Sequence, residues 1–421
     1  MAAAHYLSQA GCAVDLYEAS DQLGGRVGVG QFNQEEVCFG GKNIGFEYSE
    51  FRDFLARYGD PDYDYFGINS ARLERGAVQA FNSQNKLKSL QTIASAATSR
   101  DMWRLLKAAK AVKAERQNGD TAGLYFKGLK AVTLTDYFSP RFVEKIIRPL
   151  TVRMNGAEPT HISLENFGTH LQMLLDEYEQ LNTPLSEVFS SFKKAENINI
   201  KLNQQVISIK TVNYNFIVVS NNQAETYKNL IVALPALVAA PLIRAINPTV
   251  QDALKRVRYF PVGVVLAEYE QDVFGADIRA LVLGPDSPIS NIGAYSATQL
   301  NRVRYTFSGE MAAEILHENL EEADLLALAE ETTAPYFNIN GNKCTNFALR
   351  YWPQGLCGYT EHEFSFQTDL SKALEATPNL YLTGDYRKGA SIENCFRASK
   401  ACVEALIEAQ SANITPPQTA S

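Results

Sequence analysis

The chain has 421 residues, 46% of them hydrophobic and 20% charged, with a formal net charge of −8 at pH 7. This length suggests two domains or one large α/β enzyme fold, and the composition is that of a folded globular protein. The acidic balance argues against binding along a phosphate backbone, so no nucleic-acid partner is expected.

The N-terminal residues predict a helix that is followed at once by a strand. Apolar residues recur at three- and four-residue spacing over Met1–Ala10, Gly11 ends the helix, and Ala13–Tyr17 predicts a short strand ending at Glu18. This order is typical of the second half of a β-α-β unit. We therefore expect the first strand of the unit to lie before Met1.

The segment Asp101–Gln117 predicts an amphipathic helix. Its apolar face would contain Met102, Leu105, Leu106, Ala109 and Val112, and its basic face Lys107, Lys110, Lys113 and Arg116. The favoured interpretation is a solvated basic face over a protein core. Peripheral contact with a membrane surface is the alternative.

The rest of the chain changes from helices to strands and back. A helix is predicted to end at Lys194, and alternating or β-branched residues predict strands from Asn197 onward. The later predicted elements are strands at 198–202, 216–219, 230–233 and 379–383, an acidic helix at 320–331, and an amphipathic helix from Ile392 to Leu406. The tail after Ala409 is polar and contains Pro416 and Pro417, so residues 411–421 are predicted to be disordered.

A metal site, disulfides and a membrane span are not predicted. The five histidines and six cysteines are scattered without CxxC or HxxxH spacing. The cysteines lie mostly among apolar residues, which is typical of buried thiols in a reducing compartment and predicts a cytoplasmic protein. The most apolar stretch, Leu230–Ile243, is too short to span a bilayer and contains Pro235 and Pro241.

The segment Asp15–Gly28 (DLYEASDQLGGRVG) has the residues of a dinucleotide site. A carboxylate at the end of the second strand of such a unit accepts hydrogen bonds from the adenosine ribose, and Glu18 is placed for that. Gly24 and Gly25 allow close backbone approach to a phosphate, and Arg26 offers a fork of donors to it. The carboxylate and the Gly-Gly-Arg turn at this separation are more specific than Glu18 alone.

This segment resembles the flavin amine oxidases, protoporphyrinogen oxidases and phytoene desaturase-like enzymes. In that superfamily it follows a strand, a GxGxxG loop and a helix similar to AAAHYLSQAG. The resemblance implies FAD as the cofactor, with its pyrophosphate on the glycine loop. Because the loop does not occur in the sequence, we expect an N-terminally truncated chain, through a misassigned start codon or a shortened gene, that holds FAD weakly.

The resemblance continues along nearly the whole chain. In FGGKNIG (Phe39–Gly45) it implies that backbone at Gly40 and Gly41 lies against the flavin ring, and in QQVISI that backbone at Val206 pairs with adenine. IVALPAL (Ile231–Leu237) matches the family's strand-and-proline element.

The C-terminal segment LYLTGDYRKGASIENCF completes the resemblance. Gly384 and Asp385 match a Gly-Asp pair whose carboxylate reaches the ribityl chain. A helix starting at Ile392 and Glu393 would direct its free N–H groups at the N1/O2 edge of the flavin. Three positions depart from the family: Asn394 and Lys400 replace glycines, and Cys357 replaces a proline in YWPQGLCGYT.

Candidate catalytic residues follow from the same resemblance. Lys42, Tyr351 and Trp352 are nearest to where the family places the flavin. Lysine is usually exposed and the two aromatic residues could equally be core, so these roles stay open beside the plain structural ones.

The predicted fold class is α/β, with a Rossmann-like FAD domain of the GR2 type that lacks its first strand and a mixed α+β substrate domain. The FAD domain would comprise 1–60, 190–240 and 370–410, and the substrate domain 61–189 and 241–369. The predicted reaction is oxidation or desaturation of a C–N or C–C bond of a lipophilic small molecule by hydride transfer to flavin. The alternatives are a non-catalytic binding or scaffold relative, and an NAD-linked dehydrogenase, which would leave Gly384–Asp385 unexplained.

Overall fold

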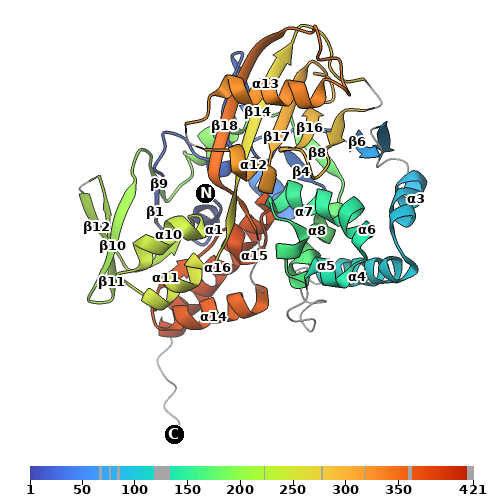
Figure 1. Ribbon diagram of the computed structural model, residues 1–421. Coiled ribbons are helices and arrows are strands. Elements are labelled where there is room, and N and C mark those ends of the chain that lie inside the picture. Colours follow the sequence, from blue (N-terminus) through green and yellow to red (C-terminus); the bar gives the residue numbers. More distant parts are fainter. Residues whose placement is uncertain are drawn as a thin grey trace.

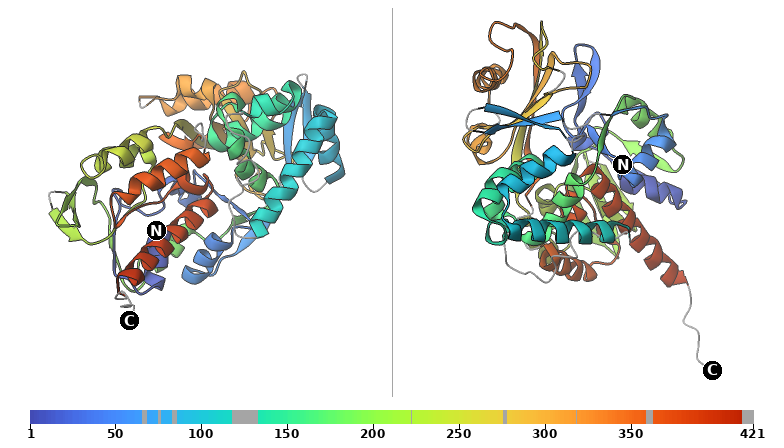
Figure 2. Two further views of the ribbon diagram at one scale, coloured as in Figure 1. Left: turned by 90° about the horizontal axis from the view of Figure 1, so that it is seen from below. Right: turned by 90° about the vertical axis from the view of Figure 1, so that its right-hand side faces the viewer.

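The structure is a computed structural model, which describes residues 1–65, 69–74, 77–82, 86–117, 133–221, 223–275, 278–317, 319–358 and 363–414. Figure 1 shows a large sheet at the top, a group of helices at the lower right, and a layered part at the lower left and centre. In the layered part, the N-terminal helix α1 (Ala2–Gln9) packs against the C-terminal helix α16 (Ile392–Ile414), and the view from below shows the two together (Figure 2).

Two parallel strand pairs form the centre of the layered part. In one, β1 (Val14–Tyr17) pairs with β9 (Ile198–Lys201), and in the other β13 (Leu230–Val232) pairs with β19 (Leu380–Leu382). Within the described residues the two pairs are separate sheets. A third, antiparallel sheet has the order β10 (Val206–Val212), β11 (Asn215–Ser220), β12 (Gln223–Tyr227).

Helices on both sides bury these strands in two cores. Phe54, Phe192 and Phe396 are packed in the core that joins α1, α16, α2 (Ser49–Tyr58) and α9 (Leu185–Phe192). The second core lies between the β13–β19 pair, the antiparallel sheet and three helices. These helices are α10 (Ala236–Ile243), α11 (Pro248–Lys255) and α14 (Glu363–Glu375).

The upper sheet has seven strands in the order β18-β14-β17-β16-β15-β6-β7. Its neighbours are antiparallel except β15 and β6. The strands are β6 (Asn69–Glu74), β7 (Ala77–Asn82), β14 (Tyr259–Tyr269), β15 (Ala280–Val282), β16 (Ile289–Ala294), β17 (Arg302–Phe307) and β18 (Cys344–Cys357).

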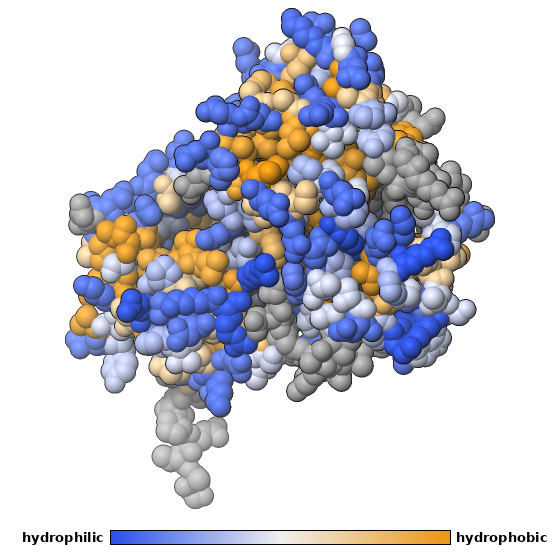
Figure 3. All heavy atoms as spheres, viewed as in Figure 1, coloured by the Kyte–Doolittle hydropathy of each residue, from blue (hydrophilic) through white to orange (hydrophobic). Residues whose placement is uncertain are grey.

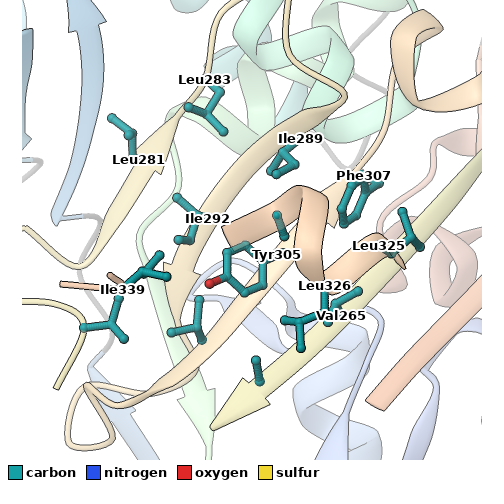
Figure 4. Packing of buried hydrophobic residues seen from close by; sticks show 14 of the residues in the cluster. Val265, Leu281, Leu283, Ile289, Ile292, Tyr305, Phe307, Leu325, Leu326 and Ile339 are labelled. Carbon is teal, nitrogen blue, oxygen red and sulfur yellow. The ribbon is translucent and has the colours of Figure 1, made fainter. Parts of the chain in front are cut away.

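Each face of this sheet has its own core. On one face Val265, Tyr305 and Phe307 pack beneath α12 (Glu310–Ile315) and α13 (Glu322–Thr333), and Figure 4 shows these side chains between strands and helix. On the other face the hairpin β2 (Val29–Phe32)–β3 (Glu35–Cys38) contributes Phe32 and Val37 to a smaller core. The hairpin therefore connects the sheet to the layered part.

The helical group and a small sheet complete the molecule. The helices are α3 (Lys86–Ala96), α4 (Ser99–Gln117), α5 (Leu134–Tyr137), α6 (Pro140–Phe142), a π-helical turn (Val143–Ile147), α7 (Arg148–Asn155) and α8 (Phe167–Leu174). The small sheet has the order β4 (Asn43–Gly45), β8 (Tyr178–Leu181), β5 (Tyr63–Tyr65). Short turns lie at Gly25–Val27, Pro159–His161 and Leu164–Asn166, and α15 is Asp385–Lys388.

The predicted mixed fold is confirmed, with two corrections to its elements. Leu106 is 60% exposed, whereas Leu105 and Val112 of the same predicted face pack in the core together with Ala108. The predicted disorder from residue 411 was wrong as far as Ile414, because α16 continues through a stretch rich in alanine, glutamate and glutamine, which favour helix. Residues 415–421 lie outside the described part of the chain. The domain boundaries stay a prediction.

Two features of the described residues bear on partners. No helix there combines the length and the apolar character that crossing a bilayer requires. No group of three or more metal-ligating side chains is found in the same residues. Figure 3 shows a surface on which hydrophilic side chains predominate and hydrophobic ones gather in a few places, including the left side near β10–β12.

Candidate active site

Glu18 directly follows β1 in the sequence and lies near the first residue of α1 in space. Its N–H donates to the Lys201 carbonyl at 3.0 Å, so it extends the β1–β9 pairing, and its carboxylate accepts from the N–H of Ser20 at 3.0 Å. Burial lowers the pKa of the Met1 α-amino group to about 6, and the negative charge of Glu18 acts against that decrease. The carboxylate therefore lies near the N-terminal end of α1, as a ribose-binding carboxylate would.

The Gly-Gly-Arg turn has an open side at Gly25. Gly24 and Gly25 adopt φ values of 115° and 53°, in the left-handed region that favours glycine. A Cβ on Gly24 would press on the Phe189 ring at 2.9 Å, whereas a Cβ on Gly25 would have no atom within 4 Å. Backbone at Gly25 can thus be approached closely by a ligand group.

Arg26 and Asp385, from opposite ends of the chain, form an ion pair. The Arg26 Nη1 to Asp385 Oδ2 distance is 2.7 Å, and the Asp385 side chain is 3% exposed. Burial acts to lower the pKa of Arg26, but the charge of Asp385 outweighs it and the net pKa is raised. Tyr259 donates to Asp385 Oδ1 at 2.7 Å and accepts from the N–H of Ala236. The structure therefore brings together two predicted cofactor residues and adds Tyr259.

Gly40 and Gly41 lie between this ion pair and the first residue of α16. A Cβ on Gly40 would collide with the Arg26 carbonyl oxygen, and the N–H of Gly40 donates to the Val27 carbonyl at 2.9 Å. A Cβ on Gly41 would lie 3.3 Å from Cδ1 of Ile392. The predicted flavin-facing backbone thus lies between the Arg26 turn and the first residue of α16.

The carboxylate of Glu393 accepts hydrogen bonds from other groups of the protein. It accepts from the backbone N–H groups of Glu50 at 3.3 Å and Phe51 at 3.1 Å, which are free at the start of α2. Arg397 donates to it at 2.7 Å. The side chain of Glu393 therefore caps α2, and any contact of Glu393 with a cofactor would use its backbone N–H. Ser391 caps α16 itself by accepting from the N–H of Asn394 at 3.0 Å.

Val206 begins β10 near Glu18. The N–H of Gln204, two residues earlier, donates to the Glu18 carbonyl at 2.8 Å, and the pairing of Val206 with Ser220 is followed by an irregularity in the ladder. Backbone at an irregular position of this kind is not fully used by the neighbouring strand. Pairing of Val206 with adenine stays a prediction.

The candidate catalytic residues divide into two groups. Lys42 Nζ lies 4.0 Å from the centroid of the Tyr295 ring, and burial, followed by the charge of Arg304, lowers the pKa of Lys42 well below its usual value. Trp352 packs on the backbone of Gly28, whereas Tyr351 points to the opposite face of β18, towards the core beneath α13. We call residues 24–28 and 39–45 together the glycine segment, and the structure brings Lys42 and Trp352, but not Tyr351, to it.

The positions that depart from the family have structural partners. Asn394 lies directly over Gly389, whose φ is 130°. Lys400 forms an ion pair with Glu50 at 2.8 Å, and the carbonyl of buried Cys357 accepts from Asn155 Nδ2 at 2.7 Å. Each replacement is therefore accommodated by packing or by a hydrogen bond.

Four residues around the site were not predicted. Tyr259 and Tyr295 lie on or next to strands of the upper sheet, Arg304 on β17 and Arg153 on α7. The Arg304 guanidinium donates to the carbonyls of Gly40 at 3.1 Å and Cys38 at 3.4 Å. None of them belongs to a motif, because they reach the site from four separate segments of the chain.

A family comparison decides the class of the protein. The family model of the flavin containing amine oxidoreductases matches residues 1–407. The chain belongs to this family. Its cofactor is therefore FAD, and the protein is a flavin-dependent oxidoreductase. No curated protein matches the chain.

Solved structures of flavoenzymes have the same fold. A putative protoporphyrinogen oxidase from Exiguobacterium sp. 255-15 superposes with a TM-score of 0.72 at 16% identity, over 97% of this chain and 96% of that one. Cyclohexylamine oxidase from Brevibacterium oxydans IH-35A gives 0.69 at 14% identity, and putrescine oxidase 0.72 at 14%, both with the same coverage. The predicted FAD-domain fold class is thereby confirmed.

Proposed function

We propose that this flavoenzyme oxidises or desaturates a C–N or C–C bond of a small lipophilic molecule. The observation that supports this is exposed apolar side chains on two segments that a backbone hydrogen bond joins beside the glycine segment. Phe46, Leu174 and Leu175 are 49%, 45% and 49% exposed, and the N–H of Phe46 donates to the Glu177 carbonyl, which ties the two segments together. Phe46 follows β4, which starts directly after Lys42. Exposed apolar surface of this kind suits an apolar substrate.

The residues that we propose to hold FAD fit such a group. The open side of Gly25 admits a phosphate, Arg26 offers its charge, and the start of α16 offers backbone N–H groups next to Gly41. The proposed set is Glu18, Gly24, Gly25, Arg26, Gly40, Gly41, Val206, Gly384, Asp385, Ile392 and Glu393, the last through its backbone.

Bound FAD supplies the acceptor for the two electrons that leave the substrate. Lys42 is proposed to take up the proton that leaves with them, at Nζ, because its lowered pKa favours the neutral amine. Trp352 is proposed to exclude water from the side of Gly28.

Two matched glycine substitutions test the cofactor site. Gly25→Ala puts a methyl group into the open side of the turn, and Gly341→Ala puts one at φ 76° with the same free space but remote from the site. Both should cost about 1 kcal/mol of stability from left-handed strain. Only Gly25→Ala should weaken FAD binding, by at least tenfold, as measured by visible absorption during titration with FAD. Equal effects of the two substitutions would exclude Gly25 from the site.

Catalysis is tested separately on the FAD-loaded protein. Anaerobic addition of lipophilic amines and of partly saturated apolar compounds should bleach the visible flavin band if one of them is a substrate. A non-catalytic binding relative would hold FAD, and its visible band would survive every addition. In the wild type the rate of bleaching should rise with pH as Lys42 loses its proton. In Lys42→Met the bleaching should be slower and its rate should not rise with pH.

We also propose peripheral contact of α4 with an anionic membrane surface. Trp103 and Leu106 are each 60% exposed on α4, and Lys107 Nζ lies 5.0 Å from the Trp103 ring centroid. Lys110 and Lys113 extend the basic character of the helix, although the whole chain has a net charge of −8. Exposed aromatic and leucine side chains beside lysines are typical of surfaces that rest on anionic lipid.

Vesicle flotation tests this contact. The protein should float with vesicles containing phosphatidylserine and less with neutral ones, and the double substitution Trp103→Ser and Leu106→Ser should abolish flotation. Tyr214→Ser, which removes a 90% exposed aromatic residue at the turn between β10 and β11, is the control and should float normally. Equal flotation of all three proteins would contradict the proposal.

For the compartment, we propose the cytoplasm. All six cysteines are free thiols, which supports a reducing environment.

A further inference from the structure

The Lys42 amine lies on the face of an aromatic ring. Its Nζ is 4.0 Å from the centroid of the half-buried Tyr295 ring, within the distance at which the electron-rich face of an aromatic side chain attracts a cation. Tyr295 directly follows β16, whereas Lys42 lies in the glycine segment. The contact therefore exists only in the folded chain.

The ring is held in place by hydrogen bonds to three separate segments. The Tyr295 hydroxyl accepts from the N–H of Cys38 at 2.9 Å, and the Tyr295 carbonyl accepts from Gln180 Nε2 at 3.2 Å. The Tyr295 N–H donates to the Arg302 carbonyl at 2.7 Å. Both the tip of the ring and its backbone are thus fixed, and moving the ring away from Lys42 would break the bond to Cys38.

The backbone next to Lys42 is held by the same glutamine. Gln180 Nε2 also donates to Oδ1 of Asn43 at 3.2 Å. Asn43 begins β4 and lies opposite Gln180 in the pairing of β4 with β8. One side chain of the small sheet therefore connects the residue after Lys42 with the backbone of Tyr295, so the fold itself brings the amine to the ring.

The ionisable groups that face Lys42 come from three elements. They are Arg304 on β17, Cys38 on β3 and Tyr295 itself. Burial and the positive charge of Arg304 favour loss of the Lys42 proton. Burial raises the pKa of Cys38 to about 11 and that of Tyr295 to about 12, so both are neutral at pH 7. Of these groups, the face of the Tyr295 ring is the one that stabilises the ammonium form at neutral pH.

We propose that Tyr295 is a positioning residue for proton transfer, which holds the Lys42 amine over its ring and stabilises the ammonium that forms there. The proton that the substrate loses ends on Nζ as a new N–H bond, and the two electrons of the substrate go to bound FAD. A cation formed in a buried place is poorly stabilised by water, and a ring face offsets part of that cost without carrying a charge. The inference rests on the proposed function for the role of Lys42, and on the printed geometry of the two side chains for the contact.

A series of rings at position 295 tests the proposal. Tyr295→Phe keeps the ring face, and phenylalanines with two and then three fluorine atoms keep the ring while weakening its attraction for a cation. Carbon NMR of protein labelled at the lysine Cε atoms reports the pH at which Lys42 loses its proton, and Lys42→Met assigns the signal. That pH should stay near the wild-type value in Tyr295→Phe and fall by about one unit with three fluorine atoms. Lys107, which lies 5.0 Å from the Trp103 ring centroid on α4, is the internal control and should titrate alike in every protein.

The same series is then followed by flavin bleaching in the FAD-loaded protein. The pH at which the bleaching rate rises should move in the same order as the Lys42 signal, and Tyr295→Leu should slow bleaching more than Tyr295→Phe. An unchanged Lys42 titration across the fluorinated rings would overturn the proposal. So would an equal shift in all ring variants, which would assign the effect to the hydroxyl bond with Cys38, or a bleaching profile that does not follow the NMR shifts.

Failure of this inference and failure of the proposed function give different results. The NMR titration needs neither FAD nor substrate, so it measures the contact by itself. A protein in which the Lys42 signal follows the ring series, but whose flavin band no compound bleaches, would contradict the proposed function, and the placement of the Lys42 amine by Tyr295 would stand.

Discussion

The two ends of the candidate active site treat positive charge differently. At the end formed by the chain termini, Arg26 is held by Asp385 at 2.7 Å, and Tyr259 completes the carboxylate's hydrogen bonds. At the other end, Arg304 on β17 donates to the Gly40 carbonyl near Lys42, and Arg153 lies on α7. We call Lys42, Arg153 and Arg304 the cluster, and neither arginine forms an ion pair with a carboxylate among the described residues. A buried pair is part of the fold, whereas unbalanced charge is held in place by the fold at a cost in stability.

The contrast separates a charge that is paired within the fold from two arginines that have no carboxylate partner in the described structure. Removing a charge should therefore change the free energy of unfolding in opposite directions at the two ends. At the paired end it should leave a partner stranded and destabilise the protein. At the cluster it should relieve the repulsion between like charges and stabilise the protein.

The largest effect is expected from Asp385→Ala. It strands the Arg26 charge and leaves the Tyr259 hydroxyl without its acceptor, so the free energy of unfolding should fall by about 3 kcal/mol. Urea denaturation followed by circular dichroism measures this. Glu270→Ala is the control, because its pair with Lys343 is 3.7 Å long and exposed, and it should change stability by less than about 1 kcal/mol. Similar losses of stability in the two variants would show that the Arg26–Asp385 pair contributes no more than an exposed ion pair does.

Tyr259→Phe should have an effect of about 2 kcal/mol, in the same direction. The substitution keeps the ring and removes the hydroxyl that donates to Asp385 and accepts from Ala236. Differential scanning calorimetry should show an earlier transition than in wild type, and FAD affinity should fall with it. Tyr214→Phe removes an exposed hydroxyl and should leave the transition unmoved. An unchanged transition in Tyr259→Phe would mean that Arg26 alone holds the carboxylate.

Sequence predicted the paired end of the site and not the cluster, and the reason is spacing. Glu18, Gly24–Gly25–Arg26 and Gly384–Asp385 lie in contiguous motifs, so the chemistry of each is visible in a short window. Arg153 and Arg304 lie on a helix and a strand that meet only in the folded chain. Nothing local distinguishes Arg304 from Arg302 two residues earlier, yet only Arg302 has carboxylate partners in the described structure.

The fold was predictable in the same uneven way. Helix α1 and strands β1, β9 and β13 were predicted nearly to the residue, because their periodicity is local. The seven-stranded sheet was not predicted, since it joins β6 and β7 near residue 70 to strands beyond residue 258. The buried face of α4 was predicted in part. Leu105 and Val112 pack in the core as predicted, whereas Leu106 is exposed because tertiary packing selects the smaller Ala108.

At the cluster, Lys42→Met should stabilise the ligand-free protein by about 1 kcal/mol at neutral pH. The folded state lowers the pKa of Lys42, so at neutral pH the unfolded chain binds a proton that the buried amine holds poorly. The stability of wild type should therefore rise with pH towards 10.5, and the advantage of Lys42→Met should shrink to nothing there. Thermal melting across that pH range measures the difference. A variant advantage that is constant with pH would show that packing, and not charge, is responsible.

Arg153→Met should give the smallest effect, a stabilisation of about 0.5 kcal/mol or less, because its side chain is exposed and water screens its repulsion from Arg304. Salt should separate this cause from packing. The gain in melting temperature should be larger in low salt than near 1 M, where charges are screened over about 3 Å. A variant that melts earlier than wild type would show that the guanidinium is stabilised within the protein. The cluster would then resemble the paired end, and the difference in sign between the two ends would be lost.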